Sequence, residues 1–269
     1  MSASVIGIYN RKGGCGKTTA TINIAASLAL KNKKVLVVDC DSQMNLSQFF
    51  ISNDEVDETE TNETIYEILQ SENEIEECIN TVSFNKKRRF KKDIDISIDI
   101  ILGSERLDYY DGSDADALKN KLNEIKEQYD FILLDFPPAH SIITVTSLCA
   151  CDYLLIPLIP AKNTSIKGFE DVMVKVEEVR EQYGANIDIL GLFYTCVQNY
   201  KSDQKELIAF SMEHKDEMGL FESTIKLDYG PVQLSEEVGE PLCVCAPNSD
   251  IAKNFIDLTK EIVKRIGEE

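Results

Sequence analysis

The chain has 269 residues, of which 43 % are hydrophobic, so it is long enough to bury a core, and its composition excludes global disorder. Its 28 Lys and Arg residues against 47 Asp and Glu give a net charge of −19, which opposes non-specific attraction to DNA or anionic lipid unless basic residues gather on one face. No apolar run approaches the roughly 20 residues that cross a bilayer, and no secretory signal is recognisable, so we expect a cytoplasmic location.

The first 40 residues predict a strand, a helix and a second strand. Residues 5–9 form a short apolar run, residues 17–30 carry apolar side chains at helical spacing, and residues 35–39 form a second apolar run ending in Asp39. Strand, helix and strand in this order make a parallel βαβ unit, whose crossover is expected to be right-handed.

The next part of the chain is unusual in its charge. Residues 51–80 hold eleven acidic residues and no Lys or Arg, and we interpret them as an acidic surface excursion in which a short helix begins at Thr64. The basic run of residues 86–92 follows, either as a solvated hairpin tip or as a tip that binds DNA or a partner. We treat residues 51–93 as this acidic excursion plus a basic insertion. Residues 94–100 then alternate Ile with polar residues, as a half-exposed strand does.

The second half of the chain alternates strands and helices. Ser113 and Asp116 predict a cap for a helix whose apolar stripe is Leu118, Leu122, Ile125 and Tyr129. Further strands are expected at residues 131–135, 153–157 and 187–194, with helices ending near Gly184 and covering 251–266. This alternation predicts one doubly wound α/β domain over residues 1–269, with a mostly parallel sheet flanked by helices.

The eight cysteines are scattered, and only two histidines are present to complete a zinc site. None of the cysteines forms a C-x-x-C pair. We therefore interpret them as buried, reduced thiols. They are Cys15, Cys40, Cys78, Cys149, Cys151, Cys196, Cys243 and Cys245.

A glycine-rich loop joins the first strand to the first helix. Gly13, Gly14 and Gly16 have no Cβ, so the backbone can turn sharply and present its N–H groups to an anion at the start of the helix. Lys17 can reach the outer phosphates of a nucleotide, and the Thr18 hydroxyl can bind Mg²⁺. The loop predicts a Mg·ATP site, which consists of Lys12, Gly13, Gly14, Cys15, Gly16, Lys17, Thr18 and Thr19.

Three acidic residues lie at or just after the ends of predicted strands, where ligands bind in open α/β sheets. Asp39 ends the second strand, Asp41 follows two residues later, and Asp135 ends the strand at residues 131–135. An acid beside a phosphate loop can hold Mg²⁺, and a further acid can polarise an attacking water. The sequence therefore predicts phosphoryl transfer to water at this edge of the sheet.

With these motifs the sequence resembles the ParA/MinD family of P-loop ATPases. Residues 12–19 match the family's deviant Walker A loop, in which Lys12 is a second lysine. Residues 35–47 resemble its Walker A′ segment, and residues 131–138 resemble its Walker B segment. The resemblance covers nearly the whole chain and is greatest for Soj-like ParA proteins without an N-terminal helix-turn-helix, which serve plasmid and chromosome partition.

The resemblance implies a role for each lysine and threonine of the loop. Lys17 would bind the β- and γ-phosphates, Thr18 the magnesium ion and Thr19 the α-phosphate. Lys12 would be the signature lysine that reaches the ATP of the other subunit in a nucleotide-sandwich dimer. A lysine donated in this way neutralises phosphate charge and makes dimerisation depend on ATP.

The resemblance also implies roles for the acids and for partners. Asp41 would position the hydrolytic water, Asp39 would belong to the magnesium-sensing switch, and Asp135 would hold the ion through water. The expected partners are a second copy of the chain and a centromere-binding protein of the ParB type. Non-specific binding to DNA would place the protein on the nucleoid. Residues 225–233, however, lack the family's usual Pro-Arg element, which leaves DNA contacts there without their usual residues. The lysines that can gather into a patch are Lys162, Lys167, Lys201, Lys205, Lys226 and Lys253.

Three other functions compete with partition. A MinD-like membrane-positioning ATPase needs a basic amphipathic C-terminal helix, whereas residues 262–269 are short and end in acid. An iron–sulfur ATPase needs cluster ligands, and the spacing of neither Cys149 with Cys151 nor Cys243 with Cys245 matches that family. The third alternative is an ATP-gated, partner-binding switch with little affinity for DNA, which the charge of −19 favours.

Overall fold

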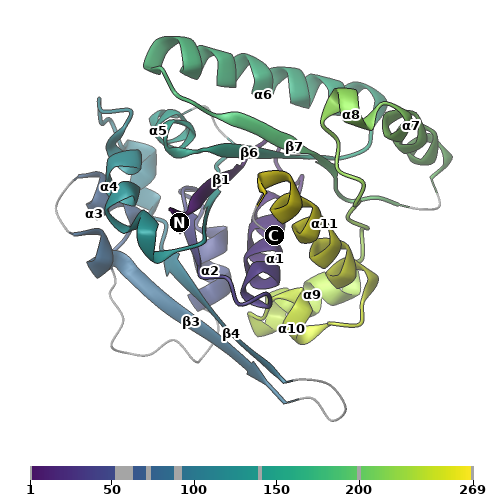
Figure 1. Ribbon diagram of the computed structural model, residues 1–269, viewed down its shortest axis with the longest axis horizontal. Coiled ribbons are helices and arrows are strands. Elements are labelled where there is room, and N and C mark those ends of the chain that lie inside the picture. Colours follow the sequence, from purple (N-terminus) through teal and green to yellow (C-terminus); the bar gives the residue numbers. More distant parts are fainter. Residues whose placement is uncertain are drawn as a thin grey trace.

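The computed structural model of the protein describes residues 2–51, 63–70, 74–87, 93–138, 141–198 and 201–267, and the backbone alone of residues 162–166. Within these residues, seven strands form one sheet in the order β3-β4-β2-β5-β1-β6-β7 (Figure 1). Neighbouring strands are parallel except β3 and β4, which are antiparallel. The strands are β1 (Ser4–Ile8), β2 (Val35–Asp39), β3 (Ile79–Lys86), β4 (Ile94–Ile101), β5 (Phe131–Asp135), β6 (Tyr153–Leu158) and β7 (Asp188–Tyr194).

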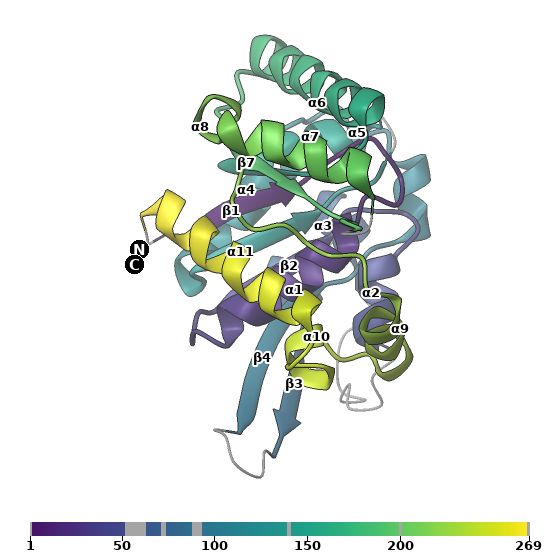
Figure 2. The ribbon, with the colours of Figure 1, turned by 90° about the vertical axis from the view of Figure 1, so that its right-hand side faces the viewer.

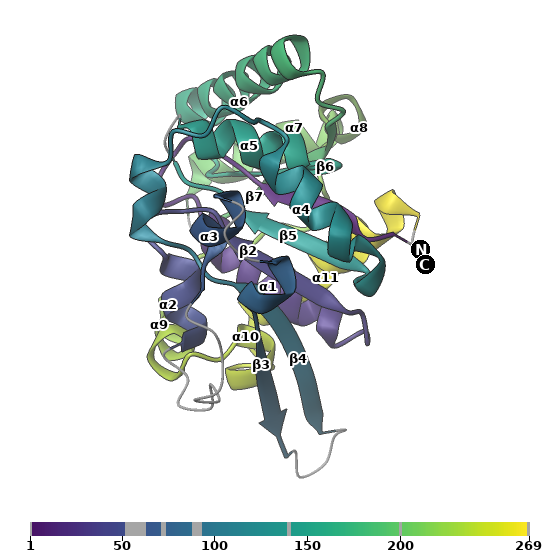
Figure 3. The ribbon, with the colours of Figure 1, turned by 90° about the vertical axis from the view of Figure 1, so that its left-hand side faces the viewer.

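Helices cover both faces of this sheet, as a doubly wound fold requires (Figures 2 and 3). Side chains of α1, α10 and α11 enter the hydrophobic core on one face, and those of α4, α5 and α6 enter the core on the other. The α-helices of the described residues are α1 (Lys17–Ala29), α2 (Asn45–Ile51), α3 (Ile65–Leu69), α4 (Ala117–Ile125), α5 (Ile142–Ala150), α6 (Lys162–Tyr183), α7 (Ser202–Glu213), α8 (Lys215–Met218), α9 (Tyr229–Val238), α10 (Leu242–Cys245) and α11 (Asp250–Ile266).

The predicted βαβ unit at the N-terminus is confirmed as β1, α1 and β2. All five residues of β2 and all five of β5 are buried, because both faces of these central parallel strands are covered by helices. The two strands pair from Val35 with Phe131 to Asp39 with Asp135. This register brings the two strand-end acids side by side at the carboxyl edge of the sheet.

The charged middle of the chain differs from its prediction. Ile65, Ile75 and Cys78 are fully buried in the core, so residues 63–70 and 74–87 are not simply a surface excursion. Residues 79–86 form β3, which pairs with β4 (predicted at residues 94–100) and makes a hairpin that projects beyond the other strands (Figure 1). Of the basic run, Lys86 ends β3 and residues 88–92 lie outside the described residues.

Two predicted helix starts have different outcomes. The short helix predicted at Thr64 is confirmed as α3, and Thr64 and Glu67 cap it reciprocally, each side chain bonding to the backbone of the other. The cap predicted for α4 is wrong, because Asp116 precedes the helix without a side-chain hydrogen bond to it. Tyr129 lies beyond the end of α4, after a short 3-10 turn.

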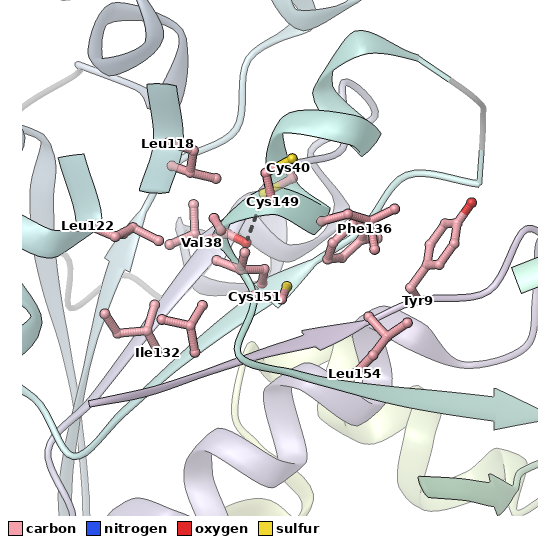
Figure 4. Close-up of a cluster of buried hydrophobic side chains, with 14 of the residues drawn as sticks. Tyr9, Val38, Cys40, Leu118, Leu122, Ile132, Phe136, Cys149, Cys151 and Leu154 are labelled. Atoms are coloured by element: carbon pink, nitrogen blue, oxygen red, sulfur yellow. Dashed lines mark hydrogen bonds between the residues drawn. The ribbon is translucent and has the colours of Figure 1, made fainter. Parts of the chain in front are cut away.

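The core contains many of the thiols, as predicted. All eight cysteines are free and six of them are buried. Figure 4 shows Cys40, Cys149 and Cys151 among apolar side chains between the sheet and its helices. The Cys40 thiol donates to the Val38 carbonyl at 3.9 Å, and burial raises its pKa. Among the described helices, none combines the length and apolarity needed to cross a membrane.

Candidate functional site

The glycine-rich loop occupies the turn between β1 and α1. Gly14 has φ of +70° and Gly16 has φ of +80°, a backbone conformation that residues with a Cβ rarely adopt. Gly16 immediately precedes the first turn of α1. A Cβ added at Gly13 or Gly14 would meet no protein atom within 4 Å, so the glycines leave open space on the ligand side of the loop. This is the geometry of a backbone cradle for phosphate.

Two buried side chains anchor the loop to strands on one side of it. The Asn10 side chain donates to the Pro157 carbonyl at 2.7 Å and accepts from the Lys12 N–H at 2.9 Å. The Thr195 hydroxyl donates to the Cys15 carbonyl at 2.8 Å. Because Asn10 and Thr195 are nearly fully buried, these bonds are shielded from water and hold the loop in a fixed position.

A pair of acids lies beneath the loop. The Thr18 hydroxyl donates to one Asp135 oxygen at 2.7 Å, and the Thr21 hydroxyl donates to the other at 3.3 Å. Asp39 is the direct neighbour of Asp135 in the β2–β5 register. The predicted metal-binding residues Thr18, Asp39 and Asp135 are therefore brought together.

Burial raises the pKa values of both acids. Burial, with the charge of Asp39 added, raises the pKa of Asp135 to about 8. Burial raises the pKa of Asp39 to about 6, although hydrogen bonds from Ser47 and Asp41 act in the opposite direction. Two adjacent carboxylates out of water are stabilised by a cation. The hydroxyl and carboxylate oxygens of this cluster are also the ligands that Mg²⁺ prefers, so the residues present fit that ion.

Asp39 also fixes the segment that leads into α2. One of its oxygens accepts from the Ser47 N–H at 2.8 Å and from the Ser47 hydroxyl at 2.7 Å, and the other accepts from the Asp41 N–H at 3.1 Å. The Ser47 hydroxyl in turn accepts from the Gly103 N–H at 2.8 Å. A Cβ at Gly103 would lie 3.0 Å from the Asp39 carboxyl carbon, so any larger residue here would push against Asp39.

Asp41 and Lys17 face a cavity of about 530 Å³ that opens beside the loop. Asp41 is 8 % exposed and accepts from the Gln43 N–H at 3.0 Å. Burial raises the pKa of Asp41, and the Gln43 N–H and the Lys17 charge oppose this shift. The turn that follows is strained, because Met44 has φ of +53°.

The lining of the cavity is partly polar and partly apolar. Gly13, Lys17 and Thr18 belong to its polar part, whereas Ile22, Phe49, Val232 and Leu242 are apolar. Its volume lies within the usual range of about 300–1,000 Å³ for small-molecule sites. The remaining lining residues are Gly14, Gly16, Thr19, Asp41, Gln43, Asn45, Gln48, Pro138 and Glu236. Polar groups of this kind can hold a phosphate chain, and apolar side chains can hold a heteroaromatic base.

Two of the eight predicted loop residues lie outside the lining of this cavity, as do the acids Asp39 and Asp135. The Cys15 side chain is fully buried, so Cys15 can contribute its backbone alone. Lys12 is half-buried and does not line the described cavity of its own subunit. Its neighbour Arg11 forms an ion pair with Asp171 at 3.4 Å.

The lysines considered for a basic patch are partly neutralised. Lys226 forms an ion pair with Asp250 at 2.7 Å, and Lys253 contacts the same carboxylate at 3.7 Å. Lys167, Lys201 and Lys205 are exposed, and the side chain of Lys162 lies outside the described residues.

The sequence did not identify several residues that support the site. Ser47 lies within the predicted Walker A′ segment but was given no role. Gly103 follows the end of β4, and a glycine at that place could have been recognised as a sign of a close approach to the backbone. Asn10 and Thr195 carry no signal of their own, because each acts through a carbonyl more than 140 positions away. Thr21 could have been found, since it lies one helical turn after Thr18 on α1.

Comparisons with known proteins agree with this geometry. A family described as an AAA domain matches residues 3–189. A virulence plasmid ParA family protein of Chlamydia psittaci is 31 % identical, over 95 % of this chain and 92 % of that protein. The chromosome-partitioning ATPase Soj of Treponema pallidum is 29 % identical, over 96 % of each chain. The structure of a Cyanothece McdA variant in complex with ATP shares the fold, with a TM-score of 0.77 and 20 % identity over 100 % of this chain and 98 % of that one.

Proposed function

The chain belongs to the AAA-domain family of the ParA and Soj partition ATPases, and we propose that it is itself a partition ATPase that binds and hydrolyses Mg·ATP. One observation carries this proposal: the Thr18 hydroxyl, which lines the cavity just after the glycine loop, donates to the buried Asp135 at 2.7 Å. The apolar walls at Ile22, Val232 and Leu242 support the binding of a purine base. Slow hydrolysis that a partner accelerates is the activity we expect.

Each residue of the site has a part in this proposal. The loop amides and Lys17 hold the phosphates, with Thr19 at the α-phosphate, while Thr18 and Asp135 hold the magnesium ion. Magnesium, when bound, neutralises phosphate charge. Asp39 keeps the switch segment in place through Ser47. Asp41, at the cavity wall, orients the attacking water and accepts its proton.

We assign Lys12 to a second subunit's nucleotide. The loop holds the backbone of Lys12 through Asn10, while the side chain lies outside the cavity of its own subunit. A lysine so placed can neutralise phosphate charge across a dimer interface. ATP would then link two copies of the chain, and a centromere-binding partner of the ParB type would act on that dimer.

The test of the dimer compares two adjacent substitutions. Lys12→Ala should abolish the dimer that a non-hydrolysable ATP analogue induces, as measured by size exclusion with light scattering against an ADP reference. Nucleotide binding should survive, because Lys17 and the loop amides remain. Arg11→Ala is the matched control, since Arg11 is engaged with Asp171, and it should dimerise like the natural protein.

Two results would count against these assignments. A Lys12→Ala protein that still dimerises with the analogue would show that Lys12 does not act across the interface. A natural protein that binds no adenine nucleotide by calorimetry would remove the ATPase proposal altogether.

A second candidate is an ATP-gated switch that binds a partner protein and has little affinity for DNA. The net charge of −19 favours it, as do the contacts that engage Lys226 and Lys253 with Asp250. Filter binding to random duplex DNA at low salt, with and without ATP, separates the two. Affinity that depends on ATP and falls steeply with salt supports partition on DNA, whereas no affinity supports the switch.

A further inference from the structure

One wall of the candidate nucleotide cavity comes from a part of the chain that is far in sequence from the glycine-rich loop. The helices α9 and α10 supply Val232, Glu236 and Leu242 to the lining of the cavity, whereas α1 supplies Thr19 and Ile22 among others. The shape of the cavity therefore depends on how α9 and α10 are held against α1.

A buried side chain of α1 joins these two parts. The Asn23 side-chain nitrogen donates to the Thr19 carbonyl at 2.8 Å, and the Asn23 side-chain oxygen accepts from the Leu242 N–H at 2.9 Å. Leu242 is the first residue of α10, so this N–H has no partner within its own helix. Asn23 is 3 % exposed, and the bond to a residue 219 positions away is therefore shielded from water.

The connection between α9 and α10 is held by hydrogen bonds of its own. The Ser235 hydroxyl donates to the Glu240 carbonyl at 2.6 Å, and the Cys245 thiol donates to the same carbonyl at 3.4 Å. Ser235 is nearly fully buried. Because these bonds join α9 to α10, a shift of α10 would also shift the part of the cavity that Val232 and Glu236 line.

The two bonds of the Asn23 side chain differ in what they hold. The bond to the Thr19 carbonyl lies within α1, where the regular backbone pattern already joins the N–H of Asn23 to that carbonyl. The bond to Leu242 leaves the helix and ends at a residue of the cavity lining. We propose that Asn23 is a positioning residue for the nucleotide, because it holds the wall formed by α9 and α10 at a fixed distance from Thr19. This role rests on the proposed function, since it requires that the cavity takes a nucleotide.

The position of this wall should matter for one half of the nucleotide more than for the other. In the proposed site the triphosphate is held by the loop amides and Lys17, whereas the base is held by apolar side chains that include Leu242. Loss of the bond between Asn23 and Leu242 should therefore weaken the binding of a nucleotide. It should leave the binding of inorganic tripolyphosphate, which has no base, almost unchanged.

The first test replaces Asn23 by serine in the full-length protein. A serine hydroxyl can donate to the Thr19 carbonyl, as the Ser27 hydroxyl donates to the Asn23 backbone carbonyl at 2.7 Å one turn later, but it is too short to reach Leu242. By calorimetry, Asn23→Ser should weaken Mg·ATP binding about fivefold and Mg·tripolyphosphate binding by less than about twofold. Ser27→Ala is the matched control, because it removes a buried hydrogen bond of the same helix and should bind both ligands like the natural protein.

A double-mutant cycle tests whether Asn23 acts through Leu242. Leu242→Ala should weaken ATP binding without affecting tripolyphosphate binding. If Asn23 positions Leu242, adding Asn23→Ser to the Leu242→Ala protein should weaken ATP binding by about twofold rather than about fivefold, because the two substitutions then affect the same contact. Thermal melts establish that each variant is folded.

Amide hydrogen exchange without nucleotide measures the bond itself. The Leu242 amide should exchange slowly in the natural protein and at least about tenfold faster in the Asn23→Ser protein, whereas the amides of α1 should keep their protection. This measurement needs no bound ligand, so its result does not depend on the ATPase proposal.

Equal weakening of ATP and tripolyphosphate binding by Asn23→Ser would overturn the positioning role, because it would mean that the loop itself is disturbed. Unchanged ATP binding, factors that multiply in the double-mutant cycle, or unchanged exchange at Leu242 would overturn it as well. Failure of the proposed function is distinguished from these results, because it would already be seen in the natural protein as binding of tripolyphosphate but of no adenine nucleotide.

Discussion

At the scale of single residues, the feature of the site that costs most folding free energy is a pair of buried carboxylates at neighbouring strand ends. Asp39 and Asp135 are adjacent in the sheet and almost wholly removed from water. Only hydroxyl and backbone amide donors form hydrogen bonds to them in the described structure, and the charge of Asp39 opposes the ionisation of Asp135. A protein keeps such a pair when a cation compensates it during function.

Because these two carboxylates are buried, the stability of the protein free of metal and nucleotide should depend on pH. The pKa is raised to about 8 for Asp135 and to about 6 for Asp39, against about 4 in the unfolded chain. Between these values the folded state holds protons that the unfolded state has lost, so the free energy of unfolding should fall as pH rises from about 4 to about 8. Asp135→Asn cannot ionise, so its melting temperature should fall less over this range.

Thermal melts between pH 5 and 9 measure this effect, with the exposed Asp95→Asn as the control of equal charge change. At pH 8 the Asp135→Asn protein should exceed the natural protein in unfolding free energy by at least about 1 kcal/mol, since one unit of pKa shift corresponds to about 1.4 kcal/mol. Magnesium with ATP should reverse the order. Parallel pH profiles of the natural and Asp135→Asn proteins would contradict the prediction.

The sequence predicted the residues whose role follows from local position. Asp39 and Asp135 were found because each ends an apolar run, and Lys17 because it follows glycines before a helix. Ser47 was missed because its two partners are far apart in sequence: Asp39 ends β2, and Gly103 follows the end of β4. The supporting hydrogen bonds depend on which strands become neighbours, and one sequence carries no direct record of strand order.

At the scale of elements, the segment after α8 closes the β7 edge of the sheet through backbone hydrogen bonds, and this closure depends on the last helix. Arg265 of α11 donates to the carbonyls of Leu190, Gly219 and Leu220, at 2.7 to 2.9 Å, while its guanidinium carbon lies 3.7 Å from the centre of the Phe221 ring. A planar guanidinium can make these contacts at the same time, whereas an ammonium cannot. The α11 helix therefore stabilises a strand edge as well as packing on α1.

Replacing this guanidinium should weaken the fold measurably. Arg265→Lys should lower the free energy of unfolding by about 1–2 kcal/mol, because at least one carbonyl loses its charged donor and the ring contact is lost. Urea denaturation measures the loss. Lys264→Ala changes the adjacent exposed side chain and should stay within about 0.5 kcal/mol. If both variants unfold at the same urea concentration as the natural protein, Arg265 does not stabilise the edge.

The elements that the sequence predicted are those with a strong local pattern. The runs of β1, β2 and β5 and the stripe of α11 were visible, whereas β3 lay within an acidic stretch whose charge indicated a surface segment. The helix α5 was not predicted because it is buried on most sides, so its sequence lacks an amphipathic period. Burial on two faces removes the alternation on which such predictions depend.

At the scale of the whole molecule, charge opposes self-association. Two copies together carry twice the net charge of −19, so a dimer needs a specific source of attraction. In the proposed assembly, that source is a nucleotide whose phosphates are shared by Lys17 of one subunit and Lys12 of the other. The dimer should then persist only while the triphosphate is intact.

Blocking hydrolysis should consequently trap the dimer. Asp41→Ala removes the carboxylate that faces the cavity beside Lys17 but leaves the loop amides, Thr18 and Lys12 in place. Phosphate release should fall by about 100-fold or more, within the range that general base catalysis contributes. Size exclusion with light scattering should then show a stable dimer with Mg·ATP itself, which the natural protein holds only with the analogue. Screening by added salt should strengthen this dimer, because it reduces repulsion between two acidic subunits.

Asp111→Ala is the control, since it removes an exposed acid and should hydrolyse ATP and dimerise like the natural protein. Comparing how salt affects the dimers of the Asp111→Ala and Asp41→Ala proteins separates the effect of removing a charge from the effect of blocking hydrolysis. A monomeric Asp41→Ala protein with saturating Mg·ATP would separate Asp41 from the hydrolytic step. A dimer that salt dissociates would instead show that attraction between charged groups, which includes the contact of Lys12 with phosphate, outweighs the net repulsion.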